Sequence, residues 1–66
     1  MFSFDPLWKS LIDKKMTREE LRIKIGAGRG TMAKMSKGEY VAMDVLDRIC
    51  KELGIKIEEV IKYVDG

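Results

Sequence analysis

Arginine and lysine are the side chains of this sequence with the clearest potential chemistry, and they are concentrated in its middle. Residues 14–37 hold eight basic side chains against Glu19 and Glu20, a local charge of +6. Residues 41–66 hold four basic against six acidic side chains, a local charge of −2. This asymmetry predicts a surface that meets a polyanion. The basic side chains are Lys14, Lys15, Arg18, Arg22, Lys24, Arg29, Lys34 and Lys37.

Residues suited to other kinds of chemistry are scarce. The sequence has no histidine, and its single Cys50 therefore has no imidazole partner, so we expect no enzymatic activity. One cysteine and scattered carboxylates cannot assemble a tetrahedral zinc site. We accordingly expect no metal, no other cofactor and no small-molecule ligand. A lone cysteine also excludes an internal disulfide, which favours a cytoplasmic location.

The length and composition describe one small folded domain. The chain has 66 residues, of which 45% are apolar and 36% charged, a balance typical of a compact helical domain. A domain of this size buries only about 60% of its unfolded surface, which favours a homodimer. The longest apolar run is residues 40–43, so no membrane span is expected. We expect a single domain over residues 1–66 with a short N-terminal arm at residues 1–4.

The arm and the first helix are indicated by Phe2, Phe4 and the Asp5-Pro6 pair. Asp5 is expected as an N-cap with Pro6 at the first helical position, and the helix is expected to end near Lys14. The arm alternates apolar and polar residues like an edge strand. Its two phenylalanines, together with the end of the last helix, are candidate dimer contacts, and the alternative is that they fold back on their own chain.

A second helix has the clearest start signal in the sequence. The run Thr17-Arg18-Glu19-Glu20 matches a capping box, in which the first and last side chains satisfy each other's backbone amides. Met16 before the cap and Leu21 after it form a hydrophobic staple. The helix is expected to cover residues 18–25 and to end at Gly26 in a left-handed conformation.

The glycine-rich run at residues 26–30 does not fit a nucleotide-binding loop, because position 31 is a threonine where a third glycine is needed. A tight turn followed by a third helix over residues 29–35 fits better. Gly28 then serves as a weak N-cap, and Met32 and Met35 face inward. Gly30 inside this helix costs about 1 kcal/mol relative to alanine.

The last third of the chain shows two further helical patterns. Residues 43–53 carry an apolar stripe that ends at Gly54. Residues 57–64 repeat the same spacing with Ile57, Val60, Ile61 and Val64, which predicts a fifth helix. The expected fold is therefore all-α, a five-helix orthogonal bundle.

Two short helices joined by a glycine turn form a helix-turn-helix pattern, and at this point the chain resembles a known family. The resemblance is to the helix-turn-helix of the phage Cro and repressor type, also called Xre, and to short bacterial regulators that consist of this domain alone. It implies a transcriptional regulator that binds double-stranded DNA with its third helix in the major groove. The segments that carry it are 17–21 with Gly26, 29–35, 37–38, 5–9, 11–13, 45–46 and 49–50.

The resemblance places the groove-facing positions on the third helix, with Arg18 near the DNA backbone. Arg29 can pair bidentately with guanine, and Lys34 can take a base or a phosphate. Thr31 can meet a phosphate or a thymine methyl, and Lys37 is expected to contact a phosphate. The alternative is that these side chains are merely solvated. The candidate DNA-binding residues are Arg18, Gly28, Arg29, Gly30, Thr31, Lys34 and Lys37.

Several positions depart from the family pattern. The family usually has Ser or Thr where this chain has Gly28, and often a polar side chain at Gly30, so two possible base readers are missing. The family also favours a small residue where this chain has Arg22, and it often has a glutamate where this chain has Ser36. These departures keep open a second function, a protein-interaction module of the antitoxin or adaptor kind with weak or no base reading.

Overall fold

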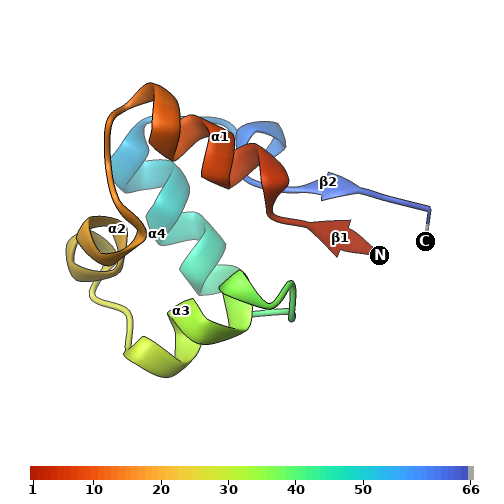
Figure 1. Ribbon diagram of the computed structural model, residues 1–66, viewed down its shortest axis with the longest axis horizontal. Helices are drawn as coiled ribbons and strands as arrows, with labels where there is room; N and C mark the ends of the chain where they lie inside the picture. The colour runs from red at the N-terminus through yellow and green to blue at the C-terminus, as the bar shows by residue number, and fades with distance from the viewer. Residues whose placement is uncertain (66) are drawn as a thin grey trace.

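The computed structural model describes residues 1–65, which form a helical body with a strand pair at one end (Figure 1). Within these residues there are four α-helices, so the expectation of five helices was wrong. The elements in chain order are β1 (Phe2–Ser3), α1 (Asp5–Asp13), α2 (Arg18–Ile25), α3 (Arg29–Ser36), α4 (Met43–Leu53), a 3₁₀ turn (Ile57–Glu59) and β2 (Lys62–Tyr63).

Helix α4 lies at the centre of the fold, with α1 above it and α2 and α3 beside and below it in Figure 1. Its buried face carries Val45, Leu46, Ile49 and Leu53, as the apolar spacing predicts. The helix ends at Gly54, whose φ of 62° is left-handed. The core is completed by Phe4, Leu7, Leu11, Leu21, Ile25, Met32, Met35 and Val60.

Helix α1 begins one residue earlier than the sequence suggested. Phe4, not Asp5, is the N-cap, and Asp5 is already helical. No side chain caps the helix from this N-cap position, and the Ser3 hydroxyl, one residue earlier, accepts a hydrogen bond from the Asp5 backbone N–H at 3.1 Å. Phe4 itself is buried in the core of its own chain, which removes it from the candidate dimer contacts.

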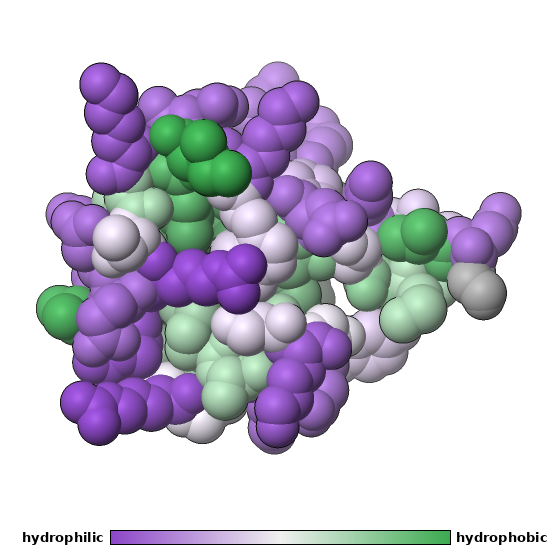
Figure 2. Space-filling model, in the orientation of Figure 1, coloured by the Kyte–Doolittle hydropathy of each residue, from purple (hydrophilic) through white to green (hydrophobic). Residues whose placement is uncertain are grey.

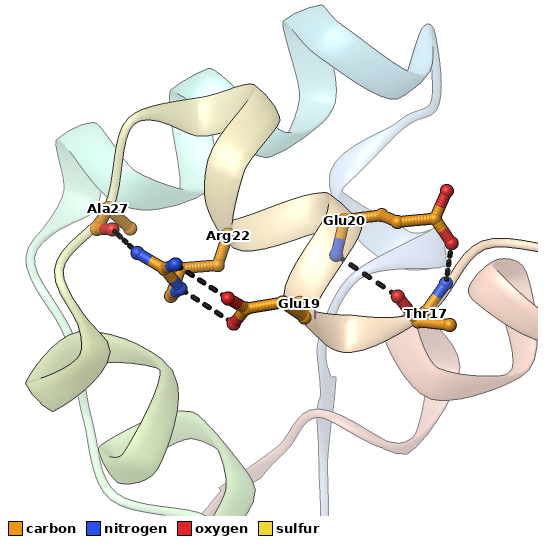
Figure 3. Close-up of polar contacts among 5 residues, drawn as sticks. All are labelled: Thr17, Glu19, Glu20, Arg22 and Ala27. Atoms are coloured by element: carbon orange, nitrogen blue, oxygen red, sulfur yellow. Dashed lines mark hydrogen bonds and ion pairs between the residues drawn. The ribbon is translucent and has the colours of Figure 1, made fainter.

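Helices α2 and α3 are the pair that the sequence predicts best. The Thr17 hydroxyl accepts from the Glu20 N–H at 3.1 Å, and the Glu20 carboxylate accepts from the Thr17 N–H at 2.9 Å (Figure 3). The Thr17 backbone N–H that donates to the Glu20 carboxylate is the main cause of the lowered pKa of this carboxyl, and the Thr17 side chain lowers it further. Gly26 closes α2 with a φ of 68°.

The C-terminal segment is a 3₁₀ turn and a strand, and the expected helix over residues 57–64 was wrong. Val60 is fully buried, and its carbonyl accepts from the Leu7 N–H at 3.2 Å. This contact turns the chain along α1 and on to β2, which pairs antiparallel with β1 so that Phe2 lies opposite Tyr63. The pairing with β1 and the contact of Val60 with α1 connect the segment to the other end of the chain and take the place of a continuous helix.

Candidate nucleic-acid interface

Helix α3 has an apolar face turned inward and a sparsely covered face turned outward. Met32 and Met35 are buried in the core, as expected. Gly30 and Ala33 lie about 60° apart on the opposite side at helical spacing, and both are exposed. The centre of the outward face therefore carries almost no side-chain volume, and the exposed Lys34 lies beside it.

The first turn of α3 is open to an anion. Gly28 is its N-cap in an extended conformation, with φ −75° and ψ 163°. No side chain of residues 1–65 accepts a hydrogen bond as a cap of this helix. The backbone N–H groups of a first turn carry the positive end of the helix dipole. Such a terminus, next to the exposed Arg29, is suited to phosphate.

Packing within the chain does not explain the glycines on either side of Arg29. A Cβ atom added at Gly28 or at Gly30 would meet nothing within 4 Å, and Gly28 has a negative φ. Gly30 is not among the residues with positive φ either. The cost of Gly30 in helix propensity is therefore not recovered by contacts inside the described fold, and the space above both glycines is free for a partner.

Replacing Gly30 with alanine is expected to raise the free energy of unfolding by up to about 1 kcal/mol, because the position is helical and unobstructed. A urea melt followed by Trp8 fluorescence measures the change. Gly26→Ala is the matched control, since its φ of 68° makes a loss of about 1–2 kcal/mol the expected result. A lower stability of the Gly30 variant would contradict this account of α3.

Arg18 is held by contacts with two other helices. Its guanidinium carbon lies 3.8 Å from the centre of the Trp8 ring on α1, a cation–π arrangement. Its Nη1 donates to the Ser36 hydroxyl at the end of α3, at 3.0 Å. Lys37 follows at the C-cap of α3. Arg18 and Lys37 therefore lie at the same end of the α2–α3 pair. The two contacts hold the Arg18 side chain in one orientation on the protein surface.

Arg22 is a structural residue of the helix-turn-helix that sequence reasoning missed. Its Nε and Nη2 donate to the two Glu19 carboxylate oxygens at 2.8 and 2.7 Å, and its Nη1 donates to the Ala27 carbonyl at 3.2 Å (Figure 3). Arg22 thus ties α2 to the turn before α3. The only sequence signal was its departure from the small residue that the family favours.

The same contact reduces the negative charge near the start of α3. The hydrogen bonds from Arg22 lower the pKa of the Glu19 carboxyl, and the charge of Arg29 lowers it further. Glu19 therefore stays ionised and paired, and a bidentate arginine–carboxylate contact compensates its charge. The basic character of the surface around Arg29 is preserved as a result.

The structure places the predicted site residues on one helix pair. Arg18 is the first residue of α2, Gly28 the N-cap of α3, and Lys37 its C-cap. All of the predicted residues are exposed except Thr31, which is half-buried. The predicted site residues that lie on α3 itself are Arg29, Gly30, Thr31 and Lys34.

Cys50 lies on α4, and burial together with the nearby carboxylates of Asp47, Glu58 and Glu59 raises the pKa of its thiol. In residues 1–65, no group of three or more His, Cys, Asp or Glu side chains is arranged to hold a metal ion. No helix in that range is long and apolar enough to cross a membrane.

The arrangement of α2, the turn at residues 26–28 and α3 defines a helix-turn-helix. The family model of the Cro/C1-type HTH DNA-binding domain matches residues 6–66, and the chain belongs to this family. It is similar to the crystal structure of the transcriptional regulator VanUg, with 37% sequence identity and a TM-score of 0.95 over 98% of this chain and 87% of that one. No curated protein matches the sequence.

Proposed function

We propose that the chain regulates transcription in the bacterial cytoplasm as a homodimer, each subunit inserting α3 into the major groove of double-stranded DNA. The observation that carries the proposal is the first turn of α3, where Arg29 stands between two glycines that packing within the fold does not require. A bare helix face lets the backbone approach DNA closely. The family membership and the likeness to a transcriptional regulator support it.

Each basic residue has a distinct proposed role. Arg29 reads a guanine, and Lys34 and Thr31 contribute to the choice of site. Arg18 and Lys37 bind phosphates on the DNA strand that runs past their end of the helix pair. The Trp8 ring and the Ser36 hydroxyl hold Arg18 in place, so less side-chain entropy is lost when it meets a phosphate.

Binding to duplex DNA is expected to weaken steeply with salt. Four to six phosphate contacts per subunit would give log K against log salt a slope of about −4 to −5 per subunit, because each contact releases counterions. A fluorescence anisotropy titration of the purified protein at several salt concentrations measures the slope. Lys51→Ala, an exposed lysine on α4, is the control and should leave it unchanged. A slope near zero would exclude DNA as the ligand.

A protein-interaction module is the second candidate function, and one observation favours it. The outward face of α3 has Gly30 and Ala33 at its centre and no polar side chain there that could read a base. Selection from random duplexes separates the two functions. An enriched sequence with two half-sites supports the regulator, whereas retention of all sequences alike, or of none, supports the interaction module.

A further inference from the structure

The exposed apolar side chains of this chain are concentrated at the end formed by the strand pair. Phe2 packs edge-on against Tyr40 and Tyr63, with ring centres 6.4 and 5.7 Å apart. Met43 is 77% exposed and stands at the start of α4. Figure 2 shows apolar side chains over the strands at the right of the view. We call Phe2, Tyr40, Met43, Ile57 and Tyr63 the apolar end.

Two hollows connect these side chains into one surface. The larger, of about 420 Å³, is bounded by Phe2, Tyr40 and Met43 and has Leu46 in its floor. The smaller, of about 310 Å³, shares Met43 and Leu46 and is also lined by Asp47, Cys50 and Ile57. All residues that line the larger hollow are uncharged, in a chain of which 36% is charged. Contiguous exposed apolar surface of this kind marks a docking site.

We propose that the occupant of the apolar end is a second copy of this chain, related by a two-fold axis. A two-fold contact brings the same surface to both sides, so the surface must be complementary to itself. The larger hollow, with its uncharged lining, meets this condition without repulsion between like charges. The rim side chains Tyr40 and Met43 protrude beside a hollow, so those of one copy can enter the hollow of the other.

The exposed area of the apolar end is close to the area that one partner buries in a dimer contact. A fully exposed aromatic or large aliphatic side chain presents about 200 Å². The five side chains of the apolar end are between 42% and 77% exposed, and together they offer about 600 Å² by the same measure. A stable interface buries about 800 Å² per partner, including a polar rim. The strands, of two residues each, are also too short to be stable without cover.

The position of the apolar end suits two DNA half-sites, and in this respect the inference rests on the proposed function. Tyr40 lies in the segment that follows the C-terminal end of α3 (Figure 1). Joining two copies there leaves the N-terminal turn of each α3 uncovered. Both copies of Arg29 then remain free to enter the major groove of the same duplex.

Sedimentation velocity without DNA, over a series from micromolar to millimolar protein, tests the interface. We expect the wild-type chain to reach twice its mass of 7.6 kDa. Met43→Glu and Tyr40→Glu each place like charges across the two-fold axis and should raise the dissociation constant about 100-fold. Glutamate at position 43 also suits a helix start, and circular dichroism checks that both variants keep their helices.

Ile12→Glu is the matched control, because Ile12 is 75% exposed on α1, outside the apolar end. It should leave the dissociation constant unchanged. A wild-type chain that stays monomeric at millimolar concentration would overturn the inference, as would a dimer that neither variant weakens. A monomer that binds DNA overturns only this interface, and a dimer that ignores DNA overturns only the proposed function.

Discussion

Replacing Ile49 with alanine is expected to lower the free energy of unfolding by about 2–5 kcal/mol. Ile49 is completely buried in α4, the helix at the centre of the core. Truncation removes its transfer free energy and leaves a cavity that a close-packed surrounding cannot fill. A domain of this length has a total stability of only about 3–10 kcal/mol. The variant should therefore be partly unfolded at physiological temperature.

Urea denaturation measured by circular dichroism at fixed protein concentration gives the change. Ile23→Ala is the matched control, because the same side chain is deleted where it is 65% exposed on α2. That change should stay within about 0.5 kcal/mol. Equal losses in the two variants would mean that helix propensity, not core packing, determines the effect of Ile49.

The elements that the sequence predicted correctly are those whose signals are local. The capping box from Thr17 to Glu20 and the left-handed Gly26 fix both ends of α2 within a few residues of chain. Gly54 does the same for the end of α4. Because such signals involve neighbouring residues only, they can be read without knowing the tertiary fold.

The C-terminal segment could not be predicted in the same way, because its conformation depends on distant partners. Its apolar spacing fits a helix, but β2 pairs with β1 at the opposite end of the chain. The Val64 N–H donates to the Met1 carbonyl at 2.7 Å. A strand pair closed across the whole sequence leaves no periodic signal strong enough to compete with a helical spacing.

Lys15 is a second position whose conformation could not be predicted from the sequence. It adopts a left-handed φ of 55° just after α1, and the Met16 N–H donates to the Leu11 carbonyl at 2.9 Å. Glycine normally occupies such a position. A lysine there gives no signal in the sequence, although the backbone hydrogen bonds of the turn hold it in place.

For the candidate site, the sequence indicated the basic residues but not their contacts. Arg18 was expected near the DNA backbone, yet its stacking on Trp8 and its bond to Ser36 join three helices. Arg22 stood out in the sequence only because the family favours a small residue at this position, and it bridges Glu19 and the turn. Contacts between elements depend on the packing of α1, α2 and α3, which spacing along the chain does not specify.

The largest effect on binding is expected at Arg29. Its replacement by alanine should cost about 1–3 kcal/mol on the selected DNA site, because a bidentate contact to guanine is lost. The preference at one base pair of each half-site should also disappear. The fold should be unaffected, since Arg29 is exposed and Arg22 keeps its two hydrogen bonds to Glu19.

The decisive comparison is the affinity of each variant for the selected site and for a site in which that guanine is replaced. Lys37→Ala is the matched control, because it removes one exposed positive charge from the other end of α3. It should weaken both sites about equally, since a phosphate contact carries no base information. If the Arg29 variant loses affinity but keeps the full preference, Arg29 is a phosphate contact. Base discrimination then has to come from Lys34, Thr31 or the deformability of the DNA.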